Sequence, residues 1–382
     1  MAEQRRPRDH RLDFFRGLAL FLIFVDHIPD NVLGWFTLPT FAFCDAAEAF
    51  IFISGYAAAM VYGRTMEHQG LLYASARIGK RVWQLYVAHL CLFMLFTAEV
   101  SYTVQRFNNP MYNDELRVGD FLAEPDVAVI KALTLEFQPT FLDILPLYIA
   151  LLLALPLILV GLRRMKGLVL LPSLLLYAAV QFWDLNLPAY PEGRVWFFDP
   201  LAWQLPFVLG AVFGFAQVHR QVLLPSRRWP ITLAAAIAGI ACVIRLLWVG
   251  HGFFEWVPAP FSAWLEPVDK TGLAPVRVVN FIALAVLAAR LIPAEARFPR
   301  WTRPIILCGQ HSLEVFCFGI LLALLGHFTL VEISDALPVQ LLVNALGIAL
   351  MVGLAYLLAW YGNGGKLPAT LAQSAMADEA RQ

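Results

Sequence analysis

About ten stretches of roughly 20 predominantly apolar residues run along this chain, and they constrain its fold more than any other feature. The hydrocarbon core of a bilayer is about 30 Å thick, and a helix of roughly 20 apolar residues crosses it. Only 15% of the 382 residues are charged, whereas soluble domains are about one quarter charged. The sequence therefore predicts an all-α integral membrane protein with about ten transmembrane helices. We place these helices near residues 12–31, 41–62, 82–102, 141–161, 167–185, 196–217, 230–250, 274–292, 304–329 and 337–361.

The distribution of Lys and Arg predicts the topology. Most of the 28 basic residues fall in the N-terminal segment, in alternate loops and in the C-terminal segment. Cytoplasmic loops carry this excess in membrane proteins, so both termini are expected in the cytoplasm. The formal net charge is zero, which predicts no bulk attraction for nucleic acid. We therefore expect a multi-pass membrane protein, with the lipid bilayer and a possible second copy of the chain as its macromolecular partners.

The domain organisation is expected to be simple. We predict a single membrane-embedded domain over residues 1–366 and a disordered cytoplasmic tail over 367–382. The longest predicted extramembrane segment, 103–140, is rich in polar residues and is expected to contain an interfacial helix near 117–137. The five cysteines are scattered through apolar segments without a CxxC pair, which predicts neither a disulfide framework nor a metal site.

The first apolar stretch carries ionisable residues that resist leaving water. His27 lies eleven positions after Arg16, and at about 100° per position the helix makes three turns plus about 20° between them. The two side chains therefore share one stripe of the helix, about 16 Å apart along its axis. Asp13 can pair with Arg16, whereas Asp26 points away from the stripe. Ionisable groups in a bilayer normally face the bundle interior or a wet cavity, which indicates function here.

Two carboxylates at the start of the second span lie at the same predicted depth as His27. Asp45 and Glu48 are expected about 6 and 10 Å below the outer surface if that helix begins near residue 41. Either one could orient the imidazole. The alternatives are that Arg16 extends to lipid headgroups and that His27 is a neutral packing residue.

The motifs around these residues resemble a known family. "LDFFRGLA" and the ten residues between Arg16 and His27 resemble the R-x10-H signature of the acyltransferase-3 superfamily of membrane acyltransferases. "EAFIFISGY" from Glu48 and "RIGKRVWQLY" from Arg77 resemble its second helix and the entry to its third. "VDHIPDN", "FLDILPLYI" and "CGQHSLEVFCFGI" are most similar to the OpgC branch, typified by succinyltransferases of osmoregulated periplasmic glucans.

This resemblance implies a bacterial inner-membrane protein that transfers an acyl group from cytoplasmic acyl-CoA to a carbohydrate hydroxyl on the periplasmic side. Arg16 matches the arginine that helps to bind CoA, and His27 matches the catalytic histidine. Glu48 and Ser54 match the second-helix pattern without a fixed role. Glu314 is the only acid in the stretch where many members carry a histidine, so whether it substitutes is open.

The chemistry fits these residue types. A sugar hydroxyl needs a general base to attack a thioester, and histidine is the usual choice near neutral pH. A carboxylate on its other nitrogen, Asp45 or Glu48, would fix the tautomer. Cations at the cytoplasmic end could bind CoA phosphates, and Arg77 and Arg81 are candidates beside Arg16, although they serve equally well as topology signals.

Three further residues are candidates for binding substrate. Asp143 could hold the acceptor sugar or simply cap a helix at the interface. Glu314 could line the same cavity or make a polar contact between helices. Ser54 could be a nucleophile, but Ser-Gly within a helix more often permits close packing.

We therefore predict an acyl-CoA-dependent O-acyltransferase with succinyl-CoA or acetyl-CoA as cosubstrate and a glucan or other polysaccharide as acceptor. No permanently bound cofactor and no metal are expected. Polysaccharide O-acetyl transfer is the nearest alternative. A proton-coupled secondary transporter is the rival from another class, because transporters also use buried charges.

Overall fold

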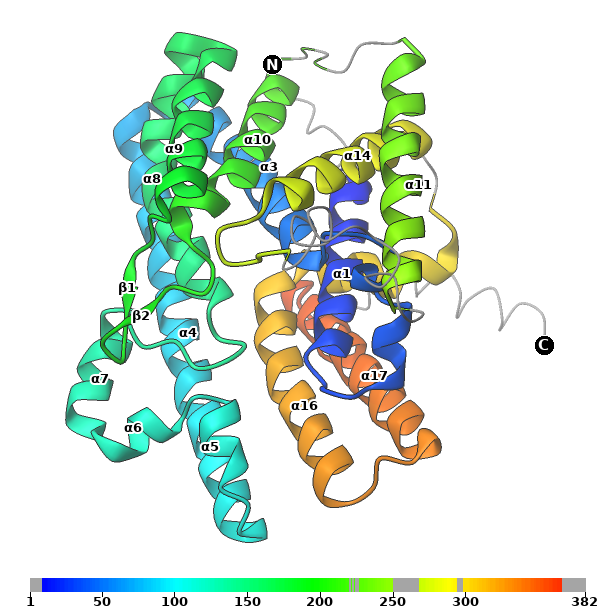
Figure 1. Ribbon diagram of the computed structural model, residues 1–382. Helices are drawn as coiled ribbons and strands as arrows, with labels where there is room; N and C mark the ends of the chain where they lie inside the picture. Colours follow the sequence, from blue (N-terminus) through cyan, green and yellow to red (C-terminus); the bar gives the residue numbers. More distant parts are fainter. Residues whose placement is uncertain are drawn as a thin grey trace. The chain divides into compact units, whose positions relative to one another are not determined.

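The computed structural model describes residues 9–219, 221, 223, 227–249, 268–293 and 298–365. The predicted tail at 367–382 lies outside these residues. Most described residues are helical (Figure 1). The chain forms two compact units, one made of both ends of the chain, Met1–Phe36 with Ile292–Gln382, and one made of its middle, Thr37–Leu291. We call them the terminal unit and the central unit and describe each by itself.

The terminal unit is built around α1. It comprises α1 (His10–Asp26), η1 (Val32–Phe36), η3 (Arg300–Thr302), α15 (Arg303–Gln310), α16 (Ser312–Glu332) and α17 (Leu337–Gly362). Asp9 caps the start of α1 by accepting a hydrogen bond from the backbone N–H of Arg11. Helices α16 and α17 form an antiparallel hairpin (Figure 1).

Glycines bring α1 and α15 into backbone contact. A Cβ atom at Gly17 would overlap the carbonyl oxygen of Ile305, and one at Gly309 would overlap that of Asp13. Small residues at such crossings let helices approach closely in a membrane. The "LDFFRGLA" and "CGQHS" motifs therefore face each other across this crossing.

Helix α17 holds the other end of α1. The ring of Phe24 occupies the space that a side chain at Gly347 would need. Asn31 and Asn344, both buried, exchange amide hydrogen bonds of 3.0 and 2.9 Å. Asn31 Nδ2 also donates to the carbonyl of Val25 in the last turn of α1, over 3.3 Å. This buried amide pair fixes the turn that follows His27.

The central unit contains the remaining helices and one short hairpin. Its elements are α2 (Leu38–Phe41), α3 (Ala46–Gln69), α4 (Leu71–Phe107), α5 (Met111–Glu115), α6 (Gly119–Ala123), α7 (Pro125–Leu133), α8 (Ile144–Met165), η2 (Lys166–Val169), α9 (Leu170–Trp183), β1 (Pro188–Ala189), β2 (Arg194–Val195), α10 (Pro200–Val218), α11 (Trp229–Val249) and α14 (Pro275–Leu291). The two strands pair antiparallel, with Pro188 opposite Val195.

Glycines also bring helices α3 and α10 into backbone contact. A Cβ atom at Gly55 would overlap the carbonyl oxygen of Phe207, and those at Gly210 and Gly214 would overlap the carbonyl oxygens of Phe52 and Tyr56. Ser54 is buried beside Gly55, so the Ser-Gly pair lies in a helix crossing, as close packing would require.

Each predicted span overlaps a described helix, but the lengths of several helices differ from the predicted lengths. By length and composition, seven of the described helices could cross a membrane: Ala46–Gln69, Leu71–Phe107, Ile144–Arg164, Pro200–Val218, Trp229–Trp248, Ser312–Glu332 and Leu337–Gly362. Helices α1, α9 and α14 occupy the other three predicted ranges but have 17, 14 and 17 residues. The chain is thus a helical membrane protein, while the count of ten spans and the cytoplasmic termini stay predictions.

Two boundaries differ from expectation for local reasons. The predicted span 304–329 is two helices, because His311 leaves helical geometry with φ −108° and ψ 41° between α15 and α16. The predicted helix near 117–137 is also two shorter helices, α6 and α7, which meet at Glu124 and Pro125. Proline lacks the N–H that would continue the first helix and instead begins the second.

Candidate functional site

His27 ends α1 with its imidazole tied to the helix. Its ring Nδ1 lies 2.6 Å from the carbonyl oxygen of Ile23, one turn earlier. A carbonyl oxygen can only accept, so Nδ1 carries the hydrogen in this bond. The neutral ring then has its lone pair on Nε2. The backbone N–H of His27 donates to the same carbonyl over 3.0 Å, which fixes both the main chain and the ring.

Arg16 lies at the crossing of α1 with α15. Its Nη1 atom is 4.0 Å from Asp13 Oδ1 and 3.5 Å from the carbonyl oxygen of Gly309. Gln310 Nε2 lies 3.3 Å from the other oxygen of Asp13. The predicted pairing of Asp13 with Arg16 is therefore confirmed. Arg16 lies within α1, which runs unbroken to Asp26, and His27 caps its C-terminal end, so the two residues are about 16 Å apart along the helix axis.

In the central unit, Asp45 and Glu48 form a capping box at the start of α3. The Asp45 carboxylate accepts from the backbone N–H of Ala47 over 2.7 Å. The Glu48 carboxylate accepts from the backbone N–H of Asp45 over 2.9 Å. This reciprocal pattern satisfies two N–H groups that the first turn of a helix leaves unpaired. Both carboxylates are thereby held at one helix end.

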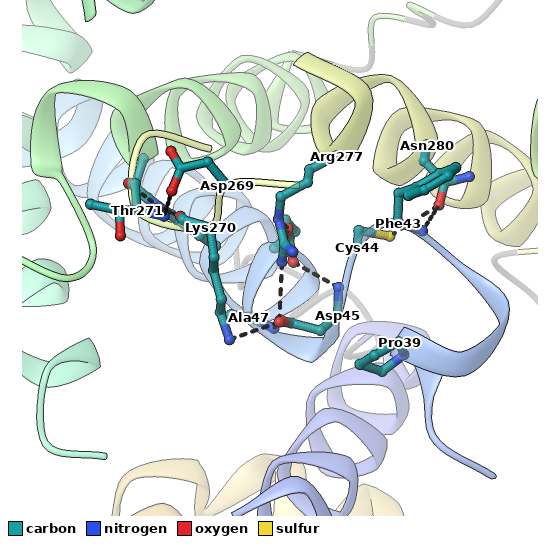
Figure 2. A network of polar contacts seen from close by, with 12 residues as sticks. Pro39, Phe43, Cys44, Asp45, Ala47, Asp269, Lys270, Thr271, Arg277 and Asn280 are labelled. Atoms are coloured by element: carbon teal, nitrogen blue, oxygen red, sulfur yellow. Dashed lines mark hydrogen bonds and ion pairs between the residues drawn. The ribbon is translucent and has the colours of Figure 1, made fainter. Parts of the chain in front are cut away.

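Two cations from much later in the chain meet these carboxylates, and Figure 2 shows both cations beside Asp45. Arg277 of α14 places Nη2 2.6 Å from Glu48 Oε1 and 3.1 Å from Asp45 Oδ2. Lys270, in the loop before α14, places Nζ 2.7 Å from Asp45 Oδ2. We call these four residues the charge cluster. Asn280 of α14 also holds the segment just before α3, because its side-chain oxygen accepts a hydrogen bond from the backbone N–H of Phe43 over 2.9 Å.

The charge cluster shifts the pKa values of Asp45 and Lys270, its two members that lie outside the helices. Burial raises the pKa of Asp45, but Lys270 and Arg277 outweigh this and hold it well below its usual range. Burial lowers the pKa of Lys270, and the Asp45 carboxylate more than compensates, so its pKa is raised. Both groups are charged at neutral pH.

The sequence indicated the carboxylate half of this cluster but not its cationic half. No motif and no periodicity relates Lys270 or Arg277 to the two carboxylates. The structure pairs both nominated carboxylates with cations of their own unit. That one of them orients His27 stays a prediction.

Three nominated residues of the central unit are not members of the charge cluster. Asp143 immediately precedes α8, and burial raises its pKa to about 6, an effect that Lys270 and then Arg117 oppose. Arg77 donates from Nη1 to Thr65 Oγ1 over 2.9 Å, and Arg81 is 3.3 Å from Gln84 Oε1 on the same helix. Arg77 and Arg81 stand one turn apart on α4.

In the terminal unit, Glu314 is exposed in the first turn of α16. Within the described ranges, no three His, Cys, Asp or Glu side chains gather in the way that a metal ion requires.

The chain belongs to the OpgC family, whose model, described as OpgC protein, matches residues 8–363. Membership of this family indicates a membrane transferase of the glucan-modifying acyltransferase class. A search of the curated proteins found no match, and neither did a search of the solved structures. The wider resemblance to the acyltransferase-3 superfamily stays a prediction.

Proposed function

We propose that this protein moves an acyl group, succinyl in the first instance, from cytoplasmic acyl-CoA to a hydroxyl of a periplasmic glucan, with His27 as general base. The observation that carries the proposal is the 2.6 Å contact between His27 Nδ1 and the Ile23 carbonyl oxygen. Because that contact places the ring hydrogen on Nδ1, Nε2 is the nitrogen that accepts a proton.

The proposed step is acyl transfer through a tetrahedral intermediate. The sugar hydroxyl loses its proton to His27 Nε2 as its oxygen attacks the thioester carbonyl carbon. The intermediate then breaks its carbon–sulfur bond and leaves an ester on the sugar. The imidazolium returns the proton to the departing sulfur, which gives CoA as the free thiol. No oxidant or metal is needed for this balance.

Arg16 is the proposed contact for the donor. Its side chain is only 14% exposed, and its Nη1 atom lies 4.0 Å from Asp13 Oδ1, a long ion pair that a phosphate could compete for. A position about 16 Å from His27 along α1 suits the nucleotide end of CoA, with the thioester end nearer the imidazole. Arg77 and Arg81 are proposed to help bind the same phosphates.

The transfer itself is tested with purified full-length protein. Succinyl-CoA or acetyl-CoA is supplied with a glucan, and both free CoA thiol and the mass of the glucan are measured. We expect thiol release that requires glucan, with a mass increase of one succinyl group per ester. A preference for acetyl-CoA would identify an O-acetyltransferase instead. Glucan uptake into vesicles driven by a proton gradient, without thiol release, would support a transporter and contradict the proposal.

A pair of variants tests whether Arg16 binds the acyl-CoA donor. Arg16→Gln removes the guanidinium and is expected to raise the KM for acyl-CoA by about 10- to 100-fold, since hydrogen bonds to charged groups are worth about 1.5–3 kcal/mol. Arg163→Gln, an exposed arginine near the end of α8, is the matched control and should leave this KM unchanged. Equal KM values for the two variants would remove Arg16 from the donor site.

A further inference from the structure

Lys270 differs from the rest of the charge cluster in its exposure. One third of its side chain (33%) is exposed, against 13% for Asp45, 9% for Arg277 and 1% for Glu48. An ammonium group has three N–H donors, and among the described residues its ion pair is with Asp45. Lys270 is therefore the member of the cluster that can bind a ligand.

The structure holds the backbone around Lys270 in place, and the ion pair with Asp45 holds its ammonium group. Trp203 Nε1 donates to the Lys270 carbonyl oxygen over 3.0 Å. The Asp269 carboxylate accepts from the backbone N–H groups of Thr271 and Gly272 over 2.9 and 2.6 Å. The backbone on both sides of Lys270 is thus fixed, as Figure 2 shows for Asp269 and Thr271. A preorganised donor loses little entropy when it binds a ligand.

Aromatic side chains lie next to the same ammonium group. Lys270 Nζ is 5.3 Å from the ring centroid of Phe198 and 5.9 Å from that of Phe197. Phe198 is buried against Trp203, with ring centroids 4.7 Å apart, whereas Phe197 is partly exposed. Phe197 therefore offers an apolar face beside a charged donor.

The local charge indicates what kind of ligand fits. The two carboxylates and two cations of the cluster cancel, and Asp143, which interacts electrostatically with Lys270, adds a further acidic group. Such a site does not favour an anion. A neutral ligand with hydroxyl groups can accept from the ammonium and donate to a carboxylate, while its C–H face lies on an aromatic ring. Sugars have this combination of groups.

We propose that Lys270 and Asp143 bind hydroxyl groups of the acceptor glucan and that Phe197 packs against its sugar ring. The choice of a glucan rests on the proposed function, whereas the site itself is assigned from the contacts around Lys270. Lys270 and Phe197 thereby become substrate-binding residues.

Binding without catalysis tests this site. A linear gluco-oligosaccharide is titrated calorimetrically into purified full-length protein without acyl-CoA. We expect Lys270→Met to weaken binding by about 10- to 100-fold, because it removes a charged donor. Lys131→Met is the matched control, since Lys131 is also ion-paired, is 37% exposed and lies outside the site. Wild-type affinity in Lys270→Met, or no binding by the wild-type protein, would overturn the inference.

A second variant covers the case in which Lys270→Met does not fold. Phe197→Ala leaves the ion pair of Lys270 with Asp45 intact and is expected to weaken oligosaccharide binding by about tenfold. Unchanged affinity in Phe197→Ala would contradict the proposed packing of Phe197 against the sugar ring.

Kinetics separate this site from an acyl-binding one. We expect Lys270→Met to raise the KM for glucan and to leave the KM for succinyl-CoA unchanged. A higher KM for succinyl-CoA but not for acetyl-CoA would mean that Lys270 binds the acyl carboxylate, which overturns the inference. Oligosaccharide binding that needs Lys270, in a protein that releases no CoA, would keep the inference and reject the proposed function.

Discussion

Arg277 and Glu48, 229 residues apart in the chain, face each other with 2.6 Å between Nη2 and Oε1 and are only 9% and 1% exposed. Taking two charges out of water costs several kcal/mol per ion, and only good geometry with additional hydrogen bonds offsets this. The same guanidinium also reaches Asp45 over 3.1 Å. This pair therefore fixes α14 to the start of α3 within the central unit.

Removing the arginine should be costly. Arg277→Met leaves two buried carboxylates short of a partner, so we expect the free energy of unfolding to fall by about 3–5 kcal/mol. Arg194→Met is the control, because Arg194 is 43% exposed and pairs with Asp120 over 3.4 Å. An exposed pair of this kind is worth about 0–1 kcal/mol. Denaturant titration in detergent measures both, and equal losses in the two variants would contradict this reading of the cluster.

The crossing of α1 with α15 should tolerate no side chain at its glycines. In Gly309→Ala the new methyl group would overlap the Asp13 carbonyl oxygen, so the two helices must separate and stability should fall by about 1–3 kcal/mol or more. Gly353→Ala in α17 is the control, since its Cβ meets open space and alanine favours a helix by about 1 kcal/mol. Melting curves of the two variants should therefore shift in opposite directions. A Gly309→Ala protein as stable as Gly353→Ala would mean that the crossing is looser than described.

Asp143 should make the stability of the folded protein depend on pH. Burial raises its pKa to about 6 from an ordinary value of 3.8, so the folded protein holds this proton more tightly than the unfolded chain. Its stabilising contribution is therefore present below the unfolded pKa and is lost as the pH rises through about 6.

The comparison with Asp143→Asn isolates this titration from all others. The melting temperature of the wild-type protein, relative to the variant, should fall as the pH is raised from about 4 to about 7 and then level off. A difference that is constant with pH, or one that grows in the other direction, would contradict the burial of this carboxyl group.

The amide pair of Asn31 and Asn344 should be energetically coupled. Asn344→Ala removes two hydrogen bonds from the buried amide of Asn31, which should cost about 1–3 kcal/mol. Because Asn31→Ala removes the same two hydrogen bonds, the double variant should cost clearly less than the sum of the single variants. Chemical unfolding of all four proteins measures the coupling, and strict additivity would show that the two amides act independently.

Hydropathy predicted the helices because a membrane span needs one property, sustained apolar length. It placed a helix in each predicted range, yet it did not show that His311 interrupts the range 304–329. Backbone geometry at a single residue leaves no hydropathy signal. The long helix α4 also exceeds its predicted range, 82–102, because its first turns carry charged residues that a hydropathy window excludes.

The candidate site also contains some contacts that the sequence predicted and others that it did not. The relation of Asp13 to Arg16 was predictable because both lie on one helix, where spacing fixes geometry. The partner of Asp45 was not, since Lys270 and Arg277 lie more than two hundred residues away and no periodicity relates them. The bond from His27 Nδ1 to Ile23 was equally hidden, because it depends on the ring orientation at the end of α1. A buried carboxylate does indicate a nearby cation, but sequence does not say which one.

The measurement that tests the central claim most directly is the turnover of His27→Asn. The asparagine amide can still donate to the Ile23 carbonyl oxygen, but it offers no basic nitrogen in the place of Nε2. His68→Asn is the control, since His68 is exposed near the end of α3. With succinyl-CoA and glucan, we predict that kcat for CoA release falls by about 10²- to 10⁴-fold in His27→Asn, with little change in the KM for acyl-CoA and none in the control. A kcat within a few-fold of wild type would contradict the role of His27 as the general base.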